Sequence, residues 1–158
     1  MKTTVNIEAL QKDAVEMFHS GFACSEAIIW ATDKHFELGM GRDAIAMSSG
    51  FPWGMGGAGC LCGAAAGAVM CLGYIFGRRE PGDPRVIRCF SVCQDFHDAF
   101  RKANGATCCR VLMHGLERED PKRKEGCTRI VENAARILAE LIMEELALDP
   151  LEPSAIDK

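Results

Sequence analysis

A long stretch without charged side chains separates Asp43 from Arg78. Its first part, residues 50–59, is rich in glycine, which adopts backbone angles that other residues avoid, so we expect a loop there. Its second part, residues 61–76, is almost wholly apolar or small and predicts a helix. Because this run is short and follows a segment broken by glycines, it favours a helix buried at the centre of the fold over one that crosses a membrane.

The remaining segments show the apolar spacing of helices, and none alternates with the period of two that strands require. Gly21 and Gly39 are stop signals, and Asp83 before a proline marks a helix start. We expect helices at about 7–18, 24–38, 42–49, 61–76, 84–103, 107–113 and 128–146. A charged linker is expected at 117–126 and a frayed tail at 147–158. The prediction is an all-α fold, a compact single-domain bundle of about six or seven helices over residues 1–158.

Composition and charge narrow the functional classes. The 158 residues are 48% hydrophobic and 25% charged, which is typical of one globular domain. The net charge of -4 lacks the basic excess needed to bind nucleic acid. The N-terminal residues lack the apolar core of a secretory signal, so we expect a cytoplasmic protein. Disulfides are disfavoured in that reducing compartment, where cysteine-rich chains more often bind metal or carry out thiol redox chemistry.

The nine cysteines are the most informative residues of the chain. None forms a Cys-x-x-Cys pair, so a zinc ribbon, a thioredoxin-type motif and a haem-attachment motif are not expected. Four of them lie in or just before the first turn of a predicted helix: Cys24, Cys62, Cys109 and Cys127. A helix start offers amide donors and a partial positive charge, which stabilise a thiolate. Such a set can ligate iron or zinc, whereas burial as small apolar side chains is the alternative.

Four further cysteines are candidates for additional metal ligands: Cys60, Cys108, Cys89 and Cys93. Cys89 and Cys93 lie four residues apart on one helix, so their side chains share a face that suits chelation, a thiol pair or core packing. Cys71 lies deep in the central helix and is expected to be inert. His114 follows closely behind the third helix-start cysteine and is a candidate ligand or base.

A glycine stripe adds a second feature to the central helix. Gly59, Gly63 and Gly67 recur every four residues, so one side of this helix has almost no side chains. These glycines would let a cofactor come close, or would let another helix pack tightly. Trp53 in the preceding loop would either shield a cofactor from water or anchor the loop in the core.

Four motifs carry a resemblance to a known family: Gly21-Phe22-x-Cys24, Cys62-Gly63-Ala64-x-x-Gly67, Cys109 and Cys127. They resemble the redox-active proteins named for a C, GCAxxG, C, C cysteine pattern, over about residues 7–146. The order here is Cys-Gly-Ala where the family label has Gly-Cys-Ala. The domain is also similar to the non-haem part of split-Soret cytochromes, which are dimeric and thought to hold an iron-sulfur cluster. The resemblance implies that these four cysteines ligate an iron-sulfur cluster used in electron transfer, without haem.

The resulting hypothesis is a small iron-sulfur redox protein that exchanges electrons with a redox partner protein. The apolar face of the last helix suits either the core or a homodimer interface. One alternative is a thiol-disulfide redox enzyme, in which a low-pKa helix-start cysteine such as Cys24 or Cys62 attacks and another cysteine resolves. A structural zinc module is the weakest alternative, because Cys-x-x-Cys pairs are missing.

Overall fold

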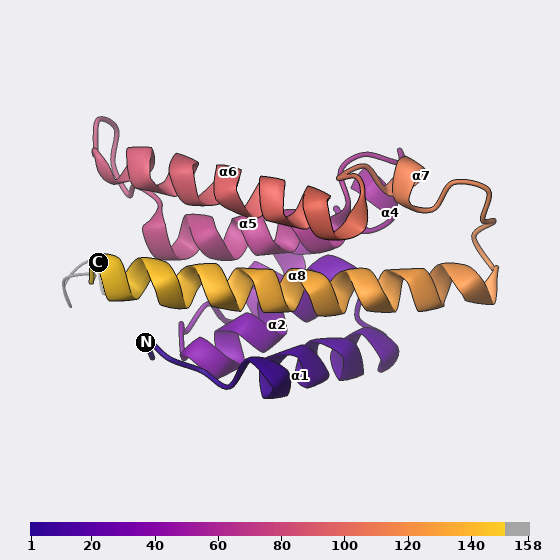
Figure 1. The fold of residues 1–158 in the computed structure, drawn as a ribbon, viewed down its shortest axis with the longest axis horizontal. Coiled ribbons are helices and arrows are strands. Elements are labelled where there is room, and N and C mark those ends of the chain that lie inside the picture. The colour runs from indigo at the N-terminus through magenta and orange to yellow at the C-terminus, as the bar shows by residue number, and fades with distance from the viewer. Residues whose placement is uncertain (151–158) are drawn as a thin grey trace.

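The computed structural model describes residues 1–150 and contains eight helices and no strand within that range (Figure 1). In chain order the helices are α1 (Ile7–His19), α2 (Cys24–Phe36), α3 (Gly41–Ser48), α4 (Pro52–Met55), α5 (Gly63–Phe76), α6 (Arg85–Asn104), α7 (Cys109–Leu112) and α8 (Pro121–Leu148). Six of them have eight or more residues, and α4 and α7 have four each. The predicted all-α fold is confirmed.

Helix α5 forms the centre of the bundle. It packs against α2, α6 and α8, and its residues Ala64, Ala68 and Leu72 are fully buried. Helix α8 has 28 residues, runs along the whole bundle and packs against α1, α2, α5 and α6 (Figure 1). The uncharged stretch therefore forms the buried central helix that its composition predicted. Over residues 1–150, the structure has no helix with both the length and the apolar character that crossing a membrane requires.

The direction of the helices brings several helix starts to one end of the bundle. Helices α2, α5 and α8 all begin at the right-hand end in Figure 1, where α1 and α6 end. The short helices α4 and α7 also lie at this end. Residues that are far apart in the sequence therefore meet there. We call it the helix-start end.

The predicted charged linker at 117–126 is wrong from residue 121 onward, because α8 already begins at Pro121. Asp120 caps the helix, with Oδ1 accepting the Lys122 backbone N–H at 2.9 Å, and proline suits the first helical position because its missing N–H has no helical partner there. Cys127 therefore lies in the second turn of α8 and not at its start.

Other boundaries differ by less. Helix α8 continues to Leu148, so residues 147 and 148 belong to it rather than to the predicted tail, whose residues 151–158 lie outside the described range. The loop predicted at 50–59 contains the short helix α4. Helix α7 begins at Cys109, after the N-cap residue Cys108, and is therefore shorter than the helix predicted at 107–113.

Candidate functional site

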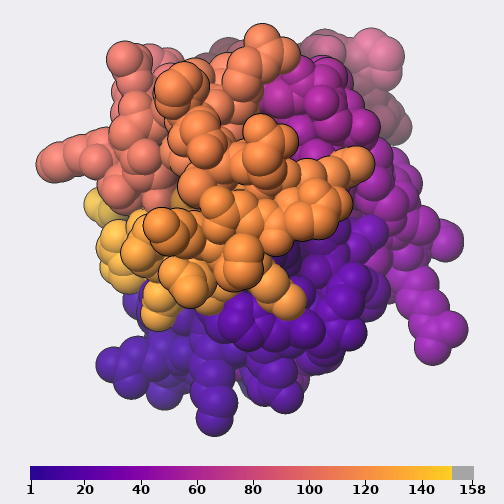
Figure 2. All heavy atoms as spheres, turned by 90° about the vertical axis from the view of Figure 1, so that its right-hand side faces the viewer, coloured from indigo at the N-terminus to yellow at the C-terminus, as the bar shows by residue number. Residues whose placement is uncertain are grey.

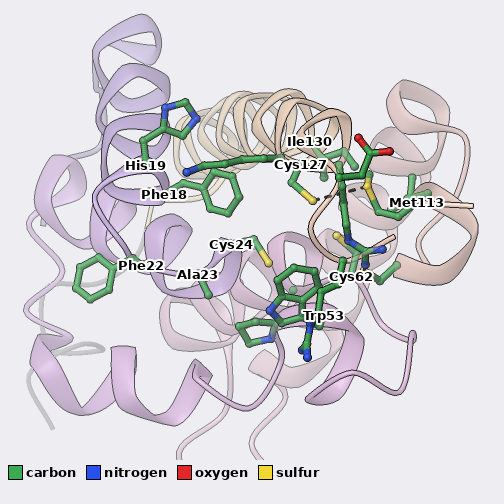
Figure 3. A pocket seen from close by; sticks show the side chains of 18 of the residues that line it. Phe18, His19, Phe22, Ala23, Cys24, Trp53, Cys62, Met113, Cys127 and Ile130 are labelled. Carbon is green, nitrogen blue, oxygen red and sulfur yellow. Dashed lines mark hydrogen bonds between the residues drawn. The ribbon is translucent and has the colours of Figure 1, made fainter. Parts of the chain in front are cut away.

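A pocket of about 600 Å³ opens at the helix-start end, which faces the viewer in Figure 2. Its walls come from the turn between α1 and α2, from α4, from the start of α5, from α7 and from the first turns of α8. Four cysteines line it: Cys24, Cys62, Cys109 and Cys127. The structure thus brings together the four cysteines that the sequence singled out, and Figure 3 shows three of them around the cavity.

Each of these cysteines reaches the pocket from a different helix. Cys24 and Cys109 are the first residues of α2 and α7, and Cys62 is the N-cap residue of α5. Cys127 reaches the pocket from the second turn of α8, where its thiol donates a hydrogen bond to Met113 Sδ at 3.8 Å (Figure 3). Four separate segments must therefore be folded together before this sulfur-rich wall exists.

Burial is the main influence on the pKa values of Cys24, Cys62 and Cys127. Burial, together with the smaller effect of the neighbouring Cys62, Cys127 and Cys109, raises the pKa of Cys24 to about 12. Burial likewise raises the pKa of Cys127 to about 11. The pKa of Cys62 is also raised by burial, although the backbone amides of Ala65 and Ala64 at the start of α5 act in the opposite direction. The low pKa expected for Cys24 and Cys62 from their helix-start positions is therefore wrong, because desolvation outweighs the helix amides.

Arg123, to which no sequence motif pointed, lies against the same wall. Its Nη2 donates to Cys109 Sγ at 3.6 Å, and its Nη1 donates to the Leu116 carbonyl at 3.0 Å. The guanidinium lies 4.8 Å from the ring centre of Trp53. Its buried Nε has no hydrogen-bond partner among the described residues. Arg123 thus places a positive charge and one unused donor beside the thiols.

Trp53 and two histidines occupy different places near the pocket. Trp53 lines the cavity, is 38% exposed and stacks under the guanidinium groups of Arg118 and Arg123. It therefore forms part of the pocket wall and is not a buried core residue. His19 also lines the pocket, and its Nε2 lies 2.8 Å from Thr128 Oγ1. His114, which the sequence favoured, lies instead along a neighbouring cleft.

The three glycines of the predicted stripe have three different neighbours. A Cβ on Gly63 would lie 2.5 Å from Cys24 Sγ, so this glycine makes room for a pocket thiol. A Cβ on Gly67 would lie 2.7 Å from the carbonyl oxygen of Ser25, which shows close packing of α5 on α2. Gly59 faces Arg110, whose Nε would lie 2.9 Å from such a Cβ. Of the three, Gly63 alone lines the pocket.

The five other cysteines lie outside the pocket lining: Cys60, Cys71, Cys89, Cys93 and Cys108. Cys71 is fully buried, and burial raises its pKa to about 12. On α6, burial and the neighbouring Cys89 raise the pKa of Cys93 to about 12. Cys60 and Cys108 face each other, with 2.8 Å between their sulfur atoms.

With this geometry established, comparison with known proteins identifies the family. A family model described as "Putative redox-active protein (C_GCAxxG_C_C)" matches residues 22–141. The chain belongs to this redox-active family. It is also 23% identical to an uncharacterized protein of Archaeoglobus fulgidus over 137 residues, which cover 82% of this chain and 91% of the relative. No solved structure matches the chain. The family suggested by the cysteine motifs is confirmed.

The four pocket cysteines line a cavity of about 600 Å³. Within residues 1–150, no three His, Cys, Asp or Glu side chains are grouped in a way that could hold one metal ion. The four pocket cysteines are nevertheless close enough that a negative charge on any of the other three would raise the pKa of Cys24. The arrangement offers four sulfur donors to a group that fills the cavity between them.

Proposed function

We propose that this protein is an iron-sulfur protein that transfers electrons, with Cys24, Cys62, Cys109 and Cys127 as cluster ligands. The observation that carries the proposal is the convergence of four thiols, from four separate helices, on one pocket. Four cysteine sulfurs are the usual ligand set of such clusters, which accept and release electrons at a potential set by their surroundings.

The donors and the cavity suit a cluster better than a single ion. Sulfur ligands select iron-sulfur clusters, zinc and copper(I). A single ion needs all its donors close to one point, whereas a cluster of several metal atoms takes donors spread around it. The spread of the thiols around a cavity of about 600 Å³ supports the second case.

The charges around the pocket support the same proposal. The raised pKa values of Cys24 and Cys127 mean that these buried thiols remain protonated at neutral pH unless a cation displaces the proton. Four bound thiolates then carry a large negative charge, which Arg123 would offset through its contact with Cys109. Hydrogen bonds to ligand sulfurs tune the potential of a cluster, and the unpartnered Nε of Arg123 is a further donor for such a bond.

The position of the pocket suits electron exchange with another protein. Trp53, 38% exposed, and the exposed Arg118 lie together at its opening. A redox partner protein would dock at this end, and an acidic surface on that partner would complement Arg118. A homodimer, as in the split-Soret cytochromes that the domain resembles, belongs to the same proposal.

The raised thiol pKa values speak against the alternative in which Cys24 or Cys62 attacks a disulfide. Thiolates are the nucleophiles in such chemistry, and burial suppresses the thiolate form of both residues. The pocket cysteines therefore suit metal binding better than thiol-disulfide exchange.

The test is an analysis of iron, acid-labile sulfide and visible absorbance in protein purified without oxygen from iron-replete cells. We expect iron and sulfide in the wild type, and their loss in Cys62→Ala and Cys109→Ala. Cys71→Ala is the matched control, because Cys71 is also buried but does not line the pocket, and it should keep its iron. Protein without iron, or colourless protein with stoichiometric zinc, would overturn the proposal.

A further inference from the structure

A pair of cysteine sulfur atoms lies at the surface, outside the pocket. Cys60 is exposed, Cys108 is half-buried, and their Sγ atoms are 2.8 Å apart. Cys60 lies in the segment that leads into α5, and Cys108 is the N-cap residue of α7. Neither residue belongs to the cysteine pattern that names the family. The pair therefore needs its own explanation.

Backbone hydrogen bonds hold the two segments together on both sides of this pair. The Cys62 N–H donates to the Thr107 carbonyl at 2.8 Å, and the Arg110 N–H donates to the Gly59 carbonyl at 2.9 Å. The Arg110 guanidinium adds a bond to the Ala58 carbonyl. Because the main chains are fixed next to each other, the two thiols meet without any rearrangement of the fold.

We propose that Cys60 and Cys108 form a second redox centre, a dithiol that reduces a low-molecular-weight disulfide and becomes a disulfide itself. The exposed Cys60 is the residue that an incoming disulfide can reach. An open cleft of about 640 Å³, lined by Gly59 and Arg110 among others, lies beside the two segments, and its volume is in the range of small-ligand sites.

The exchange proceeds in two steps. Cys60 Sγ, after losing its proton, attacks one sulfur of the incoming disulfide; a mixed disulfide forms, the original S–S bond breaks, and one thiolate leaves and takes up a proton. Cys108 Sγ, also deprotonated, then attacks Cys60 Sγ, which forms the Cys60–Cys108 bond and releases the second thiolate. The two cysteines lose two electrons, and the incoming disulfide gains them and ends as two thiols.

The location of the pair links this centre to the pocket. Cys60 is two residues before Cys62, and Cys108 is adjacent to Cys109. A bond between Cys60 and Cys108 would join the segments that carry two of the four pocket cysteines. The exchange itself needs no metal, so it does not depend on the iron-sulfur proposal.

The experiment uses the full chain, reduced and then incubated with glutathione disulfide, quenched with acid, alkylated and digested with trypsin. A Cys60–Cys108 bond joins the tryptic peptides 43–78 and 103–110. We expect this cross-link and the release of about two molecules of glutathione per chain from the wild type. Cys108→Ser should release about one molecule and keep one glutathione on residue 60, because the resolving thiol is missing.

Controls separate this pair from the other cysteines. Cys60→Ser should form no cross-link, and Cys93→Ser should behave as the wild type because its thiol lies on α6. The same two peptides also contain Cys62 and Cys109, so a cross-link that survives in both Cys60→Ser and Cys108→Ser would overturn the proposal. Absence of any cross-link in the wild type would do the same.

Iron and sulfide measured on the same preparations keep the two proposals distinguishable. Cys60→Ser that retains the wild-type iron content supports a separate dithiol centre, whereas loss of iron would make Cys60 a cluster ligand and overturn it. Iron-free protein that still forms the cross-link would refute only the iron-sulfur proposal.

Discussion

Alanine substitutions at two glycines of α5 test the central packing of the fold. A Cβ on Gly67 would lie 2.7 Å from the Ser25 carbonyl oxygen and 3.0 Å from its Cα. Both are main-chain atoms, so α2 and α5 must separate to admit the methyl group. A Cβ on Gly73, in the same helix, meets no atom within 4 Å outside the helix backbone. Gly67 and Gly73 therefore lie in the same helix, but only Gly67 is in close contact with another helix.

The expected free energies of unfolding follow from these contacts. In a helix, replacing glycine by alanine raises the free energy of unfolding by about 1 kcal/mol, so we expect Gly73→Ala to be more stable than the wild type by about that amount. At Gly67 the same gain is opposed by overpacking, for which we take about 3 kcal/mol because the obstacle is main chain. Gly67→Ala should therefore be destabilised by about 2 kcal/mol, and its Tm should fall by roughly 4 to 8 °C.

Urea unfolding of the metal-free protein, followed by far-ultraviolet circular dichroism, measures both variants under identical conditions. The slope of the unfolding free energy against urea concentration should be unchanged, and only the urea concentration at the midpoint of the transition should shift. The reasoning would be refuted if Gly67→Ala were as stable as Gly73→Ala, because α2 and α5 could then not be in backbone contact at Ser25.

Three further predictions address the pocket, the core and the surface. Arg123→Met should weaken iron binding by about ten- to a hundredfold, since it removes the donor to Cys109; an unchanged affinity in competition with an iron chelator would contradict that contact. Cys71→Ala should leave iron content unchanged and reduce stability by about 1 kcal/mol, because one buried sulfur is lost; a thermal scan beside the iron assay checks both. The hydrogen bond from Lys34 lowers the pKa of Asp13 below its ordinary 3.8, so this carboxylate stabilises the fold above that pH and loses its effect as the pH falls through the lowered pKa. Asp13→Asn should therefore show a smaller stability loss on acidification, and an unchanged acid-unfolding curve would contradict the ion pair.

Most of the helices could be predicted because their signals are local. Apolar spacing and stop signals located α1, α2 and α6 to within a few residues, and the uncharged stretch identified the buried α5. The start of α8 was missed even though Asp120 and Pro121 repeat the Asp-Pro signal that marked the start of α6. The charged residues that follow them are typical of a solvated linker, so Asp120 was not recognised as a helix cap.

The site was harder to predict, because its properties depend on burial and on contacts between distant segments. The family motifs pointed to the four pocket cysteines, but the direction in which the pKa values of Cys24 and Cys62 shift depends on how deeply the fold buries them. Arg123 lies in the segment interpreted as a linker, so nothing local suggested that it contacts Cys109. Similarly, 48 positions separate Cys60 from Cys108, and only the folded loops bring them together.

The topology explains why both sulfur sites occupy the same end of the molecule. Helices α2, α5 and α8 start there (Figure 1), so Cys24, Cys62 and Cys127, which lie near their starts, line one pocket without being near in sequence (Figure 3). The short helix α7 brings Cys109 to the same cavity. The residue before it, Cys108, pairs with Cys60 outside the pocket. The backbone hydrogen bonds between the segment before α5 and the segment at the start of α7 therefore position cysteines of both sites. A disulfide between Cys60 and Cys108 would lie two residues along the chain from Cys62 and next to Cys109, two of the four cysteines that line the pocket.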